Sequence, residues 1–218
     1  MQKISKSWWV LTLLSLGVII PFMAPYFMFD PAQSRVPITS TTVQYPLLVS
    51  HIMTAFLALI TGFLQFIDRI RIKHPRLHRL LGRVYVYSVF ISGTLSLAIV
   101  YYAENYTKAI AFLVLALFWL YTCWKGYRTA VKKEYEEHRK WMIRSFGFTL
   151  VAVSGRLVVP VLLLLYYLLN GFSLPHGREA MIEEVLNVNI WVALMLNVAI
   201  VEWGILKSGK RRSARITD

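Results

Sequence analysis

Two segments of the sequence join a histidine to an arginine, and this combination could hold a cofactor. His78 is followed by Arg79, and His138 is followed by Arg139, with Arg144 less than two helical turns further on. A neutral imidazole can ligate haem iron or another metal, and a neighbouring guanidinium can pair with a propionate or a phosphate. The competing interpretation is that both segments are solvated and face lipid headgroups.

A third histidine, His51, and an arginine, Arg156, lie within long apolar runs. Ionisable side chains are costly in hydrocarbon, so we expect both to face a protein interior, at similar depth in the outer half of a membrane. Pro160 cannot donate a hydrogen bond to the carbonyl of Arg156, which predicts a kink flanked by Ser154, Gly155 and Arg156.

Helical periodicity groups these residues into stripes of polar and small side chains, which predict one lined interior. Small residues alone also allow close helix packing, and that simpler interpretation does not explain His51 and Arg156. The three stripes are His51, Thr54, Ala55, Ala58, Gly62 and Gln65; His78, Gly82, Tyr85, Val89, Ser92 and Ser96; and His138, Ser145, Thr149, Ala152 and Arg156.

The elements that must position these residues are membrane helices. Of the 218 residues, 57% are hydrophobic and only 16% are charged, a composition that excludes a soluble globule. A span needs about 20 apolar residues. The chain offers six, which predicts an all-α polytopic bundle forming a single membrane domain over 1–218. The spans are 8–29, 47–67, 84–103, 109–127, 141–167 and 188–206, with a short amphipathic helix near 176–187 on the outer face.

The formal net charge of +13 is a topology signal. Twenty Lys and Arg residues fall on one side of the predicted membrane, three on the other, and Arg156 lies within a span. The positive-inside rule then predicts that both termini are cytoplasmic. We expect the lipid bilayer, with added affinity for anionic lipid, to be the partner of this charge rather than nucleic acid. A single cysteine, Cys123, excludes an internal disulfide and a thiolate zinc site.

Other polar residues in the spans are expected to hold the helices together. Glu202, near the inner boundary, is expected to reach the interface or to pair with an arginine. Asn189 and Asn197 are expected to join neighbouring helices. The short 104–108 turn predicts that spans three and four are antiparallel neighbours.

The function that these residues favour is haem b binding for electron transfer, with a quinone as a redox partner. The iron ligands would be His78 and His138, or His51. Arginines would compensate the propionate charge, and further polar groups would line the site. The arginines are Arg79, Arg139, Arg144 and Arg156, and the lining groups are Gln65, Tyr85, Ser145 and Thr149.

Three other functions remain open. The first is a transporter or binder of a small anionic or lipidic substrate, with a site around Arg156 and His51. The second is a membrane enzyme that uses His51 as acid or base opposite Arg156. The third is a purely structural subunit.

The motifs resemble a family of bacterial predicted membrane proteins known only as a domain of unknown function, number twenty-three-oh-six. The resemblance covers roughly residues 47–165 and implies a multi-helix protein of the bacterial cytoplasmic membrane, with no activity attached. It rests on His51 with Gly62-x-x-Gln65, His78-Arg79-x-x-Gly82-Arg83-x-Tyr85, His138-Arg139-x-Trp141-Met142-x-Arg144, and Ala152-x-x-x-Arg156-Leu157-x-x-Pro160.

The chain is also similar in architecture to six-helix transmembrane cytochromes of the ascorbate-dependent b type, which place histidines near both membrane faces. Those proteins hold haem between two pairs of histidines. Here His51 has no second histidine at its depth, which leaves Met195 or an open coordination position. This likeness concerns the architecture alone.

Overall fold

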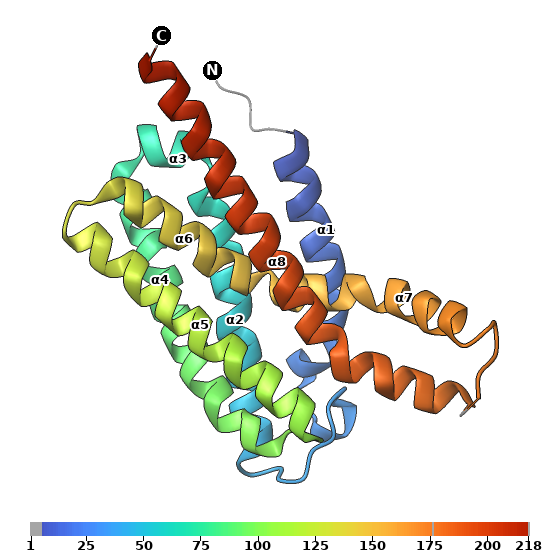
Figure 1. Ribbon diagram of the computed structural model, residues 1–218. Coiled ribbons are helices and arrows are strands. Elements are labelled where there is room, and N and C mark those ends of the chain that lie inside the picture. Colours follow the sequence, from blue (N-terminus) through green and yellow to red (C-terminus); the bar gives the residue numbers. More distant parts are fainter. Residues whose placement is uncertain (1–5, 176, 218) are drawn as a thin grey trace. The chain divides into compact units, whose positions relative to one another are not determined.

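The computed structural model describes the backbone of residues 6–175 and 177–217 and the side chains as far as Ser208 (Figure 1). Lys3 and the basic side chains of the tail beyond Ser208 therefore lie outside the described residues. Over the described ranges the chain is helical and contains no strand. The elements are α1 Lys6–Met23, η1 Ala24–Met28, η2 Pro31–Gln33, α2 Gln44–Gln65, α3 Asp68–Lys73, α4 Pro75–Ile99, η3 Val100–Tyr102, α5 Tyr106–Val131, α6 Tyr135–Thr149, α7 Val151–Leu169 and α8 Gly177–Thr217.

Six segments of the described chain are long and apolar enough to cross a membrane, which confirms the predicted all-α, six-span class. They are Lys6–Met28, Gln44–Gln65, Pro75–Tyr102, Tyr106–Val131, Val151–Leu169 and Gly177–Ser208. The orientation of the termini stays a prediction.

The fifth span differs from the prediction. Residues 141–167 do not form one helix, because the helix is interrupted at Leu150, between the end of α6 and the start of α7 (Figure 1). Thr149 donates its hydroxyl to the carbonyl of Ser145, and Ser154 donates to that of Leu150. Such bonds bend helices. The sequence analysis did not predict this break, and α7 continues as a helix through Pro160.

The last helix also differs from the prediction. Residues 177–187 are the first turns of α8, so the separate amphipathic helix expected near 176–187 is wrong. No glycine or proline interrupts the sequence between Arg178 and Trp203, and therefore nothing stops the helix where the apolar run begins. His176 lies outside the described residues.

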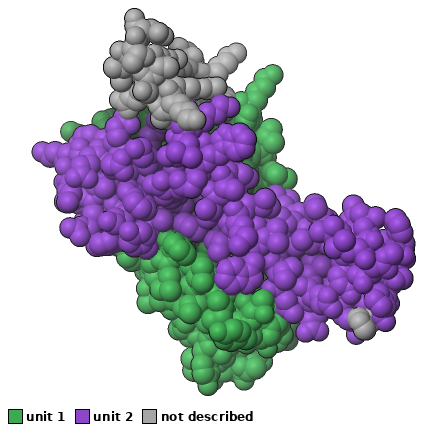
Figure 2. Space-filling view, viewed as in Figure 1, with its two compact units in different colours: residues 1–120 green, residues 121–218 purple. Residues whose placement is uncertain are grey.

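The chain divides into two compact units, residues 1–120 and 121–218, with the boundary inside α5 (Figure 2). The expectation of one membrane domain stays a prediction.

Unit 1 is built on the pairing of α2 with α4. Both helices present their small residues to each other, and Ala58, Val89 and Ser92 have no exposed surface. Close approach also joins α4 to α5, because a Cβ on Gly93 would lie 2.6 Å from Cδ2 of Leu120. The α1 helix contacts α2 through the edge-to-face pair of Trp8 and Phe63, and it tightens to a 3-10 helix at Ala24, between its two prolines.

Unit 2 contains the end of α5 followed by α6, α7 and α8, and α8 packs along both α6 and α7. Two amides of α8 bond carbonyls on either side of the break at Leu150. Asn197 donates to the carbonyl of Gly147 at 2.9 Å, and Asn189 donates to that of Gly155 at 3.1 Å. These bonds confirm that the two asparagines join helices.

Candidate functional site

His51 on α2 is fixed by Ser92 on α4. Its Nδ1 lies 2.9 Å from the carbonyl oxygen of Ser92 and 2.9 Å from the Ser92 hydroxyl, which itself donates to the carbonyl of His51 at 3.1 Å. A carbonyl oxygen only accepts hydrogen bonds, so Nδ1 carries the proton. The neutral ring therefore keeps its lone pair on Nε2, which is the atom that could bind a metal or take up a proton.

The two predicted stripes of unit 1 meet along the α2 and α4 interface. Besides the bond of His51 to Ser92, Gln65 donates its amide to the carbonyl of His78 at 2.9 Å and lies beside Gly82. Tyr85 is fully buried between these contacts. The sequence motif that contains Gln65 and the motif that contains His78 are thus in direct contact between α2 and α4.

His138 in unit 2 repeats the arrangement of His51. Its Nδ1 lies 2.7 Å from the carbonyl oxygen of Gly126 on α5, so Nδ1 again carries a proton, and in the neutral form of the ring the lone pair is on Nε2. Gly126 allows this approach because its missing side chain leaves room for Met142, whose Sδ would lie 2.5 Å from a Cβ at that position. Two of the three predicted iron ligands, His51 and His138, can therefore offer the same ring nitrogen, Nε2, to a metal.

The remaining predicted residues of α6 and α7 do not share one face. Ser145 and Thr149 are buried, and Ser145 is hydrogen-bonded to the Cys123 thiol. Beyond the break, Ala152 is exposed, and the Arg156 guanidinium donates to the carbonyl of Ala152 on its own helix. The predicted straight stripe from His138 to Arg156 is wrong, because the break at Leu150 interrupts the helical phase.

The charged candidates differ in their surroundings. Arg79 and Arg139 are exposed, whereas Arg144 forms a two-pronged pair with Glu202 on α8, with Nε to Oε1 at 2.6 Å and Nη2 to Oε2 at 2.9 Å. The hydrogen bonds and charge of Glu202 raise the pKa of the Arg144 guanidinium above its usual value. The expectation that Glu202 pairs with an arginine is confirmed, and the charge of Arg144 is already balanced within the protein.

Glu202→Gln is expected to lower the free energy of unfolding by about 1 kcal/mol, the upper range for pairs that are partly exposed. The side chains of Arg144 and Glu202 are 23% and 40% exposed, which limits the effect. The coupling between the two residues is measured by thermal unfolding in detergent of Arg144→Glu, of Glu202→Arg and of the exchanged pair that combines both substitutions.

The exchanged pair should recover most of the loss, and strictly additive single effects would contradict the prediction. Lys140→Gln is the matched control. It breaks the exposed pair of Lys140 with Glu137 and should change stability by less than about 0.5 kcal/mol.

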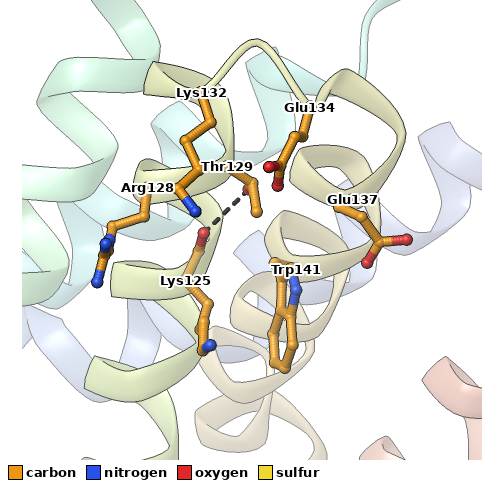
Figure 3. Close-up of a pocket in the computed structure, with 7 residues that line it drawn as sticks. All are labelled: Lys125, Arg128, Thr129, Lys132, Glu134, Glu137 and Trp141. Atoms are coloured by element: carbon orange, nitrogen blue, oxygen red, sulfur yellow. Dashed lines mark hydrogen bonds between the residues drawn. The ribbon is translucent and has the colours of Figure 1, made fainter.

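Among the described residues, no three His, Cys, Asp or Glu side chains gather as ligands for a metal ion. The sequence analysis missed a pocket of about 270 Å³ between the end of α5 and the start of α6 (Figure 3). The sequence does carry a signal for this pocket, because four of its lining residues repeat at helical spacing, namely Lys125, Arg128, Thr129 and Lys132. The pocket is lined by Lys125, Arg128, Thr129, Lys132, Glu134, Glu137 and Trp141.

A comparison with family models matches residues 48–205 to the predicted membrane protein family DUF2306. The matched range includes all three candidate histidines, Arg144, Arg156 and the lining of the pocket. Comparison with curated proteins and with solved structures finds no match. Because the match spans well over half of the sequence, the chain belongs to the DUF2306 family of predicted membrane proteins.

Proposed function

We propose that this membrane protein binds haem b and transfers electrons, with His51 in one compact unit and His138 in the other each offering Nε2 to the iron of a separate haem. One observation carries the proposal: on both rings Nδ1 donates to a main-chain carbonyl, at Ser92 and at Gly126. Histidines that ligate metals commonly donate the other ring N–H in this way, which fixes the ring orientation and makes the ligating nitrogen more basic.

The positions of the two histidines support the same function. His51 lies within a candidate span, where an ionisable group is costly unless it has a role. His138 adjoins the exposed Arg139, whose guanidinium is available for an acidic group such as a haem propionate. Bound haem would supply the electron transfer, and a quinone dissolved in the bilayer is the redox partner that we propose. His78 stays a third candidate ligand.

The test is the absorption spectrum of the full chain, expressed with sufficient haem and purified in detergent. We expect a Soret band, sharpened α and β bands after reduction with dithionite, and a pyridine haemochrome of the b type. His138→Ala should reduce the haem content, and His74→Ala, which changes an exposed histidine at the start of α4, should leave it unchanged. A wild-type preparation without haem absorbance would overturn the proposal.

A further inference from the structure

The pocket in unit 2 has two walls of opposite character. On α5 and the residue that directly follows it, the i, i+3, i+4, i+7 spacing of one helix face is followed by Lys125, Arg128, Thr129 and Lys132. The opposite wall has Glu134 at the cap of α6, with Glu137 and Trp141 one and two turns later. A cationic face is therefore opposed by carboxylates and an indole ring.

The charges of the pocket are not balanced by ion pairs among themselves. Glu137 is paired with Lys140 at 2.7 Å, outside the pocket lining. Within the part of the chain that the structure describes, Lys132 and Glu134 form no ion pair. Figure 3 shows both of these side chains pointing toward the space between the helices, with the Trp141 ring below them. An ammonium and a carboxylate are thus both available to one ligand.

The pocket lies at the level expected for lipid headgroups. It lies at the end of the apolar α5 span, and aromatic residues, which favour the membrane interface, lie beside it. The Lys125 ammonium lies 5.6 Å from the centre of the Trp124 ring, and the Arg128 guanidinium lies 5.0 Å from the same ring. Tyr121 and Trp141 form an edge-to-face pair nearby.

We propose that this pocket binds the headgroup of a zwitterionic phospholipid, one that carries both a phosphate and a primary ammonium, as phosphatidylethanolamine does. The phosphate is held by Lys132 and Lys125. The ammonium is held by Glu134, since the Trp141 ring already has the Arg144 guanidinium 4.7 Å from its centre. The volume of about 270 Å³ is near the lower end of the range for ligand pockets, which suits a headgroup alone. Headgroup binding here requires no haem at His51 or His138.

The experiment measures lipid retention by native mass spectrometry of the detergent-purified full chain. The chain is equilibrated with equal amounts of phosphatidylethanolamine and phosphatidylglycerol that carry the same acyl chains. The wild type should retain phosphatidylethanolamine about fivefold more, because only this lipid offers an ammonium to Glu134. Glu134→Gln should remove the preference, while Lys132→Gln should weaken retention of both lipids and keep their ratio.

Two exposed residues of α8 supply matched controls, and Glu184→Gln and Lys207→Gln should change nothing. Equal retention of the two lipids by the wild type, or an unchanged ratio in Glu134→Gln, would overturn the proposal. Added glycerophosphoethanolamine distinguishes the source of the headgroup. If this soluble compound displaces the lipid at equal concentration, the pocket serves free aminophosphates and the lipid assignment fails.

Discussion

His51→Ala is expected to lower the haem content of the purified protein by one haem per chain. The substitution removes the imidazole that Ser92 orients within the α2 and α4 interface, and alanine offers no ligand in its place. The pyridine haemochrome assay, normalised to protein concentration, measures the loss.

Ser92→Ala provides a graded comparison. It removes the hydroxyl that contacts Nδ1 but keeps the main-chain carbonyl that also accepts from it. Loss of such a supporting group typically lowers metal affinity by about tenfold or more, so haem should be retained more weakly rather than lost. Haem content that is equal in the wild type and in His51→Ala would show that His51 is no ligand. Such a result would leave the phospholipid pocket untouched.

Gly93→Leu is expected to destabilise unit 1 by about 3 kcal/mol, at the upper end of the cost of overpacking. A Cβ on Gly93 would lie 2.6 Å from Cδ2 and 2.8 Å from Cγ of Leu120, so even the first added carbon forces α4 and α5 apart or displaces the leucine. The thermal midpoint in detergent should fall by about 10 °C.

Leu120→Ala in the same chain should restore part of this stability, because it vacates the volume that the new leucine needs. Gly17→Leu is the matched control, since nothing lies within 4 Å of a Cβ at that position of α1. If the Gly93→Leu protein had the same thermal midpoint as the wild type, α4 and α5 would not be in close contact at this position.

The number and type of the elements could be predicted from the sequence because apolar length is a local property. Each of the six runs carries its own signal, and the pairing of α2 with α4 follows from stripes that both helices carry. The break at Leu150 could not be predicted in this way. Residues 141–167 form an unbroken run without proline before Pro160, and the bend depends on hydroxyl and amide bonds that exist only in the folded unit.

The same limit applies to the candidate site. Periodicity identified His51 and His138 as residues of interest, but the tautomer of each ring depends on a carbonyl of another helix, at Ser92 and at Gly126. A main-chain carbonyl has no signature in a sequence. The opposition of Lys132 and Glu134 across a pocket has no such signature either, because it depends on the turn between α5 and α6.

The two asparagine hydrogen bonds of α8 together fix the length of the path through α6 and α7 relative to that of α8. Asn189 and Asn197 are eight residues apart, and so are their partners Gly155 and Gly147 on the antiparallel path through the break. Eight residues of unbroken helix advance about 12 Å, so the bent path covers the same distance despite its interruption. The lengths of the two paths are therefore tied to each other. Between these contacts, a residue gained or lost on one path has to be matched on the other, and related chains should vary in length at the loops instead.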